Sequence, residues 1–155
     1  MLNLELPKEI LERIEDSARQ YGKQTPTHKR YAAELYARIG DVRRLRNVEI
    51  SIGDWSPLPK ECHKNVTLVS VHDDRFTPVR GWLYFDFGGL LEYVLFLAHS
   101  VVRLPSGELW DITPAKSLLD YPFLAATESE VEYAALVESG VIQLWHRKES
   151  TPTNR

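Results

Sequence analysis

The chain has 155 residues, of which 43% are hydrophobic and 26% charged, and its formal net charge is −3. This length and composition suit one folded domain, so disorder throughout is excluded and a strongly basic nucleic-acid binder is not expected. The single cysteine excludes an internal disulfide and any zinc site that needs two thiolates. No apolar run approaches the roughly 18 residues of a membrane span and no signal peptide is recognisable, so we expect a cytoplasmic protein with no membrane partner.

The first 40 residues predict a helical hairpin. Pro7 suits the start of one helix and Gly22 its end, and Thr25 followed by Pro26 suits a capped second start. Apolar residues recur at spacings of three and four behind each start, as expected of amphipathic helices. Residues 41–57 follow as a polar connector, with a short strand expected over 48–52.

The pattern from residue 58 to residue 146 is typical of an α+β core of catalytic type, which makes residues 1–146 a single domain. Strands are predicted over 77–87, 90–104, 109–113, 122–125 and 141–145, and a helix over 128–139. Gly88-Gly89 predicts a hairpin between the first two strands. The expected fold is α+β: an N-terminal helical hairpin, then a central antiparallel sheet with a cysteine-bearing helix packed against it. Residues 147–155 are predicted to be a flexible tail.

The segment around the single cysteine fits two local structures. Residues 60–72 are rich in β-branched side chains, which favours a strand. Cys62, Val66 and Val69 are also spaced by four and three residues, which places them on one face of a helix. A helix that began at Cys62 would lower the thiol pKa from its unperturbed value of about 8.5 and make the thiolate available as a nucleophile. The alternative is a small, buried, structural cysteine.

A second chemical pattern joins His99 to Asp111 through a predicted hairpin. The loop Pro105–Gly107 favours a three-residue turn, because proline suits a type I turn and glycine the left-handed position after it. That loop pairs Leu104 with Glu108. Counting back from this pair places His99 and Asp111 on one face of the hairpin as diagonal neighbours, roughly 7–8 Å apart at the backbone. An imidazole and a carboxylate can bridge that distance.

A carboxylate behind a histidine fixes the tautomer of the ring and supports its charged form. With Cys62 at the other ring nitrogen, Cys62, His99 and Asp111 would serve as nucleophile, base and orienting group. The element from His99 to Pro114 resembles the core of transglutaminase-like and papain-type cysteine enzymes, and the resemblance covers about residues 55–115. In that superfamily a cysteine opens a helix, a histidine starts a strand and an aspartate follows on the next strand. The resemblance implies catalytic roles for these three residues.

Four more residues are candidates for contacts with a substrate or an oxyanion. Asn65 and Trp82 carry side-chain N–H groups that suit an oxyanion, as does the backbone N–H of Cys62. His63 adjoins the nucleophile, and Trp82 and Trp110 belong to the strand aromatics from which a cleft lining can be built. The plain alternatives are solvent exposure for His63 and Asn65 and core packing for the two tryptophans.

Two other classes of site are weaker. A zinc site is considered from five zinc-competent side chains: Cys62, His63, His72, His99 and Asp111. Their spacing anchors no metal site, so we expect neither a metal nor an organic cofactor. Four arginines between residues 38 and 46 are interspersed with acidic residues in a net acidic chain, which predicts a solvated connector and no nucleic-acid partner.

The expected function is thiol-dependent acyl transfer at an amide bond of a peptide or protein, as in a peptidase, a deamidase or a transglutaminase-like enzyme. The alternative is a non-enzymatic interaction or immunity-type domain with a structural cysteine. Nothing in the pattern indicates an oligomeric state.

Overall fold

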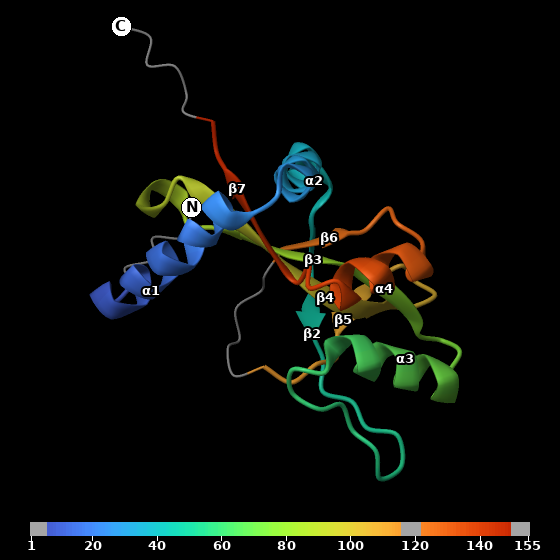
Figure 1. The fold of residues 1–155 in the computed structure, drawn as a ribbon. Helices are drawn as coiled ribbons and strands as arrows, with labels where there is room; N and C mark the ends of the chain where they lie inside the picture. The colour runs from blue at the N-terminus through green and yellow to red at the C-terminus, as the bar shows by residue number, and fades with distance from the viewer. Residues whose placement is uncertain (1–5, 116–121, 150–155) are drawn as a thin grey trace, which may run out of the picture.

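A computed structural model describes residues 6–115 and 122–149 (Figure 1). The helices are α1 (Lys8–Ala18), α2 (Pro26–Ala37), α3 (Cys62–His72) and α4 (Glu130–Glu138), with short 3-10 turns η1 (Arg19–Lys23), η2 (Ile39–Asp41) and η3 (Gly88–Leu90). The strands are β1 (Arg43–Arg44), β2 (Arg46–Asn47), β3 (Thr77–Asp86), β4 (Tyr93–Arg103), β5 (Leu109–Asp111), β6 (Pro122–Ala125) and β7 (Gln143–Arg147). This confirms the α+β class. Within the described ranges, the helices are too short or too polar to cross a membrane.

The strands form one sheet in the order β1-β6-β3-β4-β5-β2, and β7 also pairs with β4. Among the described strands all pairings are antiparallel except one, since β2 runs parallel to β5. The sheet is therefore mixed and not purely antiparallel as predicted. The connector strand expected over 48–52 is also wrong, because the connector pairs through Arg46–Asn47 and retains only an isolated bridge between Ile52 and Trp55.

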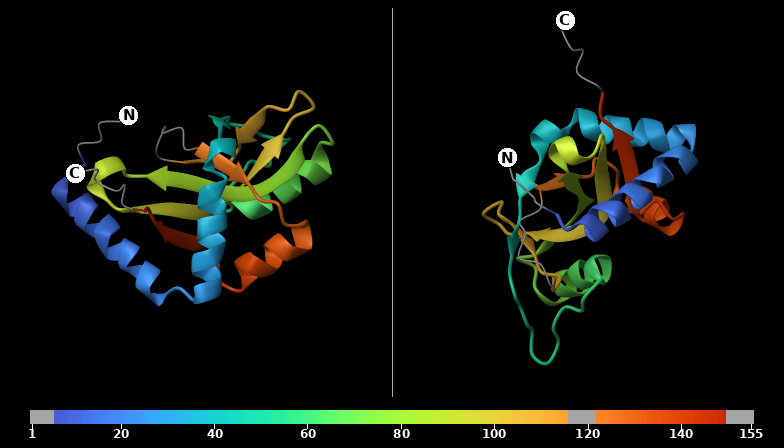
Figure 2. Two further views of the ribbon diagram at one scale, coloured as in Figure 1. Left: turned by 90° about the horizontal axis from the view of Figure 1, so that it is seen from above. Right: turned by 90° about the vertical axis from the view of Figure 1, so that its left-hand side faces the viewer.

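Strand β4 has two different partners along one edge, because its other edge is occupied by β3 throughout. Tyr93–Leu97 pairs with β7, and Val102–Arg103 pairs with β5. His99 lies between these two stretches, where the two partner strands part. Helix α3 packs against β4 and lies below α4 in the view of Figure 1. Helices α1 and α4 lie on the same side of the β3–β4 hairpin (Figure 2, left).

The β4–β5 turn has the predicted register. The Leu104 N–H donates to the Glu108 carbonyl over 3.0 Å, and Arg103 is paired with Leu109. Gly107 has a φ of 87°, the left-handed conformation that glycine adopts without a steric penalty. The three-residue loop is thus confirmed, and with it the alignment on which the prediction about His99 and Asp111 depended.

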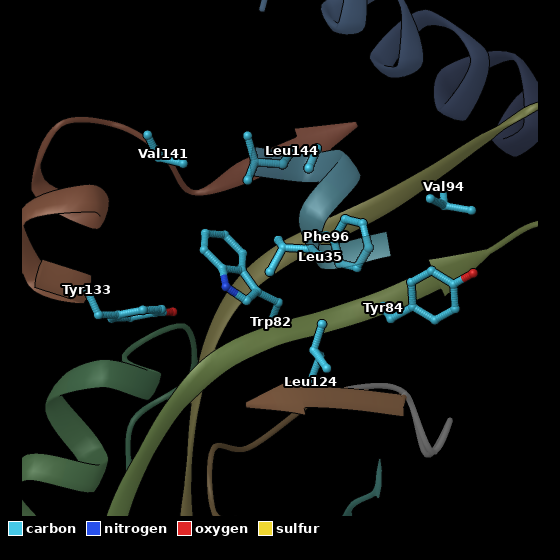
Figure 3. Packing of buried hydrophobic residues seen from close by; sticks show 10 residues of the cluster. Leu35, Trp82, Tyr84, Val94, Phe96, Leu124, Tyr133, Val141 and Leu144 are labelled. Carbon is cyan, nitrogen blue, oxygen red and sulfur yellow. The ribbon is translucent and has the colours of Figure 1, made fainter. Parts of the chain in front are cut away.

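The largest buried cluster lies between the sheet and helices α2 and α4 (Figure 3). Trp82 has no exposed surface; its ring packs against Tyr31 of α2 and Tyr133 of α4, with centroid distances of 5.8 Å to each. Tyr133 is the buried residue of α4, whereas the Val131 side chain is 79% exposed. The sequence shows the apolar residues of this helix but not which side meets the sheet.

Strand β7 is held at its outer edge by a side chain from the N-terminal region. The Gln24 amide donates to the Trp145 carbonyl over 2.9 Å and accepts from the Trp145 N–H over 2.6 Å. Arg147 still belongs to β7, and the Lys148 ammonium bonds Asp86, so the predicted tail begins too early. Residues 150–155 of that predicted tail lie outside the described residues.

Candidate active site

Cys62 is the first residue of helix α3, so the ambiguity over residues 60–72 is resolved in favour of a helix. The preceding Lys60 has a φ of 62°, a sharp turn that separates the loop from the helix. The first N–H groups of a helix have no acceptor within it and carry a partial positive charge. The thiol of Cys62 is partly exposed at this end, where a thiolate is favoured over a thiol.

Asn65 fixes the start of α3 from inside the protein. Its side-chain oxygen accepts from the Leu58 N–H over 3.0 Å, and its amide nitrogen donates to the Leu58 carbonyl over 2.9 Å. The same nitrogen donates to Thr113 Oγ1 over 3.1 Å. Asn65 is only 2% exposed, so the alternative of a solvent-exposed side chain is wrong. Its amide is committed to holding the loop before α3 and the segment after β5, which leaves no N–H for an oxyanion.

His99 and Asp111 meet as the hairpin register requires. His99 Nε2 lies 3.0 Å from Asp111 Oδ2, and the two side chains are 12% and 15% exposed. The other carboxylate oxygen accepts from the Thr113 N–H over 3.1 Å. Both carboxylate oxygens are therefore occupied and the carboxylate cannot turn. Since Nε2 faces Asp111, Nδ1 is the ring nitrogen left for the thiol.

The pKa values of Cys62 and His99 move in opposite directions. Burial alone would raise the pKa of the Cys62 thiol, but side-chain interactions with His63 and His99 lower it to about 6. Burial alone would lower the pKa of the His99 imidazole, but Asp111 and Cys62 raise it to about 9. Between these two values the favoured state is a thiolate beside an imidazolium. This is the protonation state that a cysteine nucleophile requires.

His63 is the second histidine that interacts with the thiol, and it is held by a hydroxyl instead of a carboxylate. Its Nδ1 is 2.6 Å from Ser100 Oγ, and its ring meets the Tyr133 ring edge-on at a centroid distance of 5.9 Å. The Tyr133 hydroxyl donates to the Gly81 carbonyl over 2.7 Å. His63 also interacts with the Cys62 thiol, so it lies beside the proposed nucleophile. Its contact with a substrate remains a prediction.

Arg80 was not anticipated from the sequence, although a charge within an apolar strand was a usable signal. Its Nη1 donates to the His63 carbonyl and to Ser100 Oγ, each over 3.0 Å. Its Nη2 donates to Thr67 Oγ1 over 2.9 Å, and its Nε to Glu130 over 3.1 Å. The guanidinium of this β3 residue therefore links α3, β4 and α4, and two of its partners are the His63 carbonyl and the hydroxyl that contacts the His63 ring.

Of the two tryptophans proposed as site residues, Trp82 lies in the core and Trp110 is partly buried against it. Trp82 is buried between α2 and α4, as described above. Trp110 packs against Phe76 at a centroid distance of 6.1 Å, in the cluster beneath α3. Both indoles are thus engaged in packing. Of the oxyanion donors considered, the backbone N–H of Cys62 is the one in the free first turn of α3.

No three His, Cys, Asp or Glu side chains within residues 6–115 and 122–149 are grouped so that they could hold a metal ion. No family model, no curated protein and no solved structure matches this chain.

Proposed function

We propose that the protein is a thiol-dependent acyl-transfer enzyme that acts on an amide bond. The observation that carries this proposal is the group Cys62, His99 and Asp111: a thiol with a pKa of about 6 at a helix N-terminus, beside an imidazole that a fixed carboxylate orients. These are the three roles of nucleophile, general acid–base and orienting group. The similarity to transglutaminase-like and papain-type enzymes rests on the same three residues.

In the proposed reaction the Cys62 thiolate attacks the amide carbonyl carbon, and a C–S bond forms. The oxygen of the tetrahedral intermediate lies at the first turn of α3, where the Cys62 N–H can donate to it. The C–N bond then breaks, and the His99 imidazolium gives its proton to the leaving amine. Water or a second amine, deprotonated by His99, attacks the thioester and restores the thiolate. Water gives a peptidase or deamidase, and an amine gives an acyltransferase.

The pH dependence follows from the two shifted pKa values. The rate should rise as pH passes about 6, because Cys62 loses its proton there. It should fall as pH passes about 9, because His99 then loses the proton that the leaving amine needs. A bell-shaped profile of kcat/KM is expected, with both limbs belonging to the coupled pair. Cys62→Ala should abolish the activity.

The deciding experiment is the rate of Cys62 alkylation by iodoacetamide as a function of pH. In the wild type the apparent pKa should lie near 6. In His99→Ala it should move toward the unperturbed thiol value of roughly 8.5. Because thiolate nucleophilicity falls with pKa, a rate at one pH understates this change, so the whole profile is needed. His72→Ala is the matched control, since His72 ends the same helix about 15 Å from Cys62 at a rise of about 1.5 Å per residue.

Slow alkylation with an ordinary pKa, independent of His99, would contradict the proposal. Cys62 would then be a structural residue, and the protein an interaction domain.

A further inference from the structure

An open pocket of about 380 Å³ lies between α3 and α4. Helix α3 contributes His63, Lys64, Thr67 and Leu68, helix α4 contributes Glu130, Tyr133, Ala134, Val137 and Glu138, and β3 contributes Arg80. Its surface is mostly apolar. Cys62, His99 and Asp111 do not line it, so the pocket is a separate feature from the candidate triad. Its size falls within the range of about 300–1,000 Å³ that is usual for ligand pockets.

The pocket and the thiol share a wall. His63 lines the pocket and also interacts with the Cys62 thiol, whose pKa it lowers. Tyr133 lines the pocket too, and burial and then the nearby charge of Cys62 raise the pKa of its phenol. The two rings contact each other edge-on at a centroid distance of 5.9 Å. The pocket and the thiol therefore have His63 and Tyr133 as common neighbours, and only these side chains need lie between a group in the pocket and Cys62.

The charges around the pocket are balanced. Lys64 and Arg80 are matched by Glu130 and Glu138 among the lining residues. The Arg80 guanidinium is already bonded to Glu130 and to three further oxygens on α3 and β4. No excess charge remains to select an anion or a cation. The balance and the apolar surface together favour an uncharged aliphatic group.

We infer that this pocket receives a bulky aliphatic side chain of the substrate, on the residue whose carbonyl Cys62 attacks. The inference rests on the proposed function and narrows it. The substrate is then a peptide with leucine or a similar residue on the acyl side of the reacting backbone amide. Side-chain amides, the substrates of a deamidase, fit this arrangement less well, because their acyl side is an unbranched and polar residue.

Peptidyl chloromethyl ketones test the inference without a known substrate. The Cys62 thiolate attacks the methylene carbon, a C–S bond forms, and chloride leaves with the C–Cl electron pair. The probes are the N-acetyl chloromethyl ketones of leucine, glycine and glutamate, and each second-order rate is divided by the rate with iodoacetamide. We expect the leucine probe to react about tenfold faster than the glycine probe, as burial of a leucine side chain implies. The glutamate probe should show no such gain.

Two substitutions on α4 assign the preference to this pocket. Ala134→Trp places a large ring in the pocket, so the leucine-to-glycine ratio should fall to about one. Val131→Trp is the matched control: it adds the same ring to the same helix at a position that is 79% exposed and does not line the pocket. The ratio there should stay near ten. Circular dichroism checks that both variants fold.

The outcomes separate the two proposals. Equal normalised rates for the leucine and glycine probes in the wild type, with an iodoacetamide pKa near 6 that depends on His99, would overturn the pocket assignment and leave the proposed function intact. A leucine preference that survives Ala134→Trp as well as Val131→Trp would also overturn it. An unactivated thiol in the iodoacetamide profile would overturn both proposals. The wild-type comparison needs no variant, so a poorly folded Ala134→Trp would still leave a decisive result.

Discussion

The two histidines that interact with the Cys62 thiol lie in different surroundings. His99 meets a carboxylate, Asp111, whose second oxygen accepts from a backbone N–H. His63 meets the hydroxyl of Ser100, which accepts from Arg80. A carboxylate stabilises an imidazolium by charge, whereas a hydroxyl only orients the ring. Two histidines beside one thiol can therefore be assigned different roles from the group that each one contacts.

Under the proposed function His99 exchanges the proton, and His63 positions the thiol and lines the pocket. The network behind His63 is also the more extended one, because Arg80 ties it to four elements. The His99 side depends on a single hairpin and one locked carboxylate. Substitutions behind His99 should therefore reduce the rate of the chemical step. Substitutions behind His63 should mainly disturb the position of the thiol.

The largest effect is expected for Asp111→Asn. The Thr113 N–H would keep the amide oxygen of the new side chain as its acceptor, so the NH2 group would face His99 Nε2. Nδ1 would then carry the proton and could not accept one from the thiol. We expect kcat/KM to fall by about 10²–10⁴, by analogy with the loss of the carboxylate from a Ser-His-Asp triad. Asp54→Asn, at an exposed carboxylate, is the control. A loss below threefold would mean that His99 does not need its charged partner, and the two histidines would then not differ in role.

The next effect is expected for Asn65→Ala, which tests the tie between α3 and the segment after Asp111. Three hydrogen bonds are lost, and the Leu58 N–H and the buried Thr113 hydroxyl are left without the Asn65 side chain. The free energy of unfolding should fall by about 2–4 kcal/mol in a urea titration. Val71→Ala, at a 78% exposed position on the same helix, should cost no more than about 0.5 kcal/mol. Equal costs would mean that the Asn65 bonds do not hold the helix start.

The smallest effect is expected for Ser100→Ala, on the hydroxyl side. His63 and Arg80 each lose one partner, but the Arg80 bonds to Thr67, Glu130 and the His63 carbonyl remain. We expect kcat/KM to fall by about threefold and the free energy of unfolding by about 1 kcal/mol. Ser51→Ala, at an exposed connector residue, provides the baseline. A loss as large as that of Asp111→Asn would show that His63 and His99 both take part in the chemical step.

The parts of the site that depend on local turn chemistry could be predicted from the sequence. Pro105–Gly107 determines the loop, the loop determines the register, and the register brings His99 and Asp111 together. The helix that begins at Cys62 could not be predicted from local sequence in the same way, because the valines of this segment favour a strand equally well. What holds it is Asn65, through bonds to Leu58 and to Thr113, 48 residues further along the chain.

The errors have a common physical cause in tertiary contacts. Alternation along β3 separates Trp82 from Leu83, but only the positions of α2 and α4 decide that the Trp82 side is covered. Arg80 shows the same limit, since its four partners come from three other elements. A sequence pattern reports which side chains share a surface, and the fold decides what meets that surface.

The Gln24 amide at the outer edge of β7 has a consequence for self-association. Edge strands offer free backbone groups to a neighbouring molecule, and that is a common route to aggregation. Gln24 fills the donor and the acceptor of Trp145 near the middle of this strand, as one peptide unit of an added strand would. An incoming strand would first have to displace that amide. The link between η1 and α2 thus protects the sheet edge, while α2 covers the core.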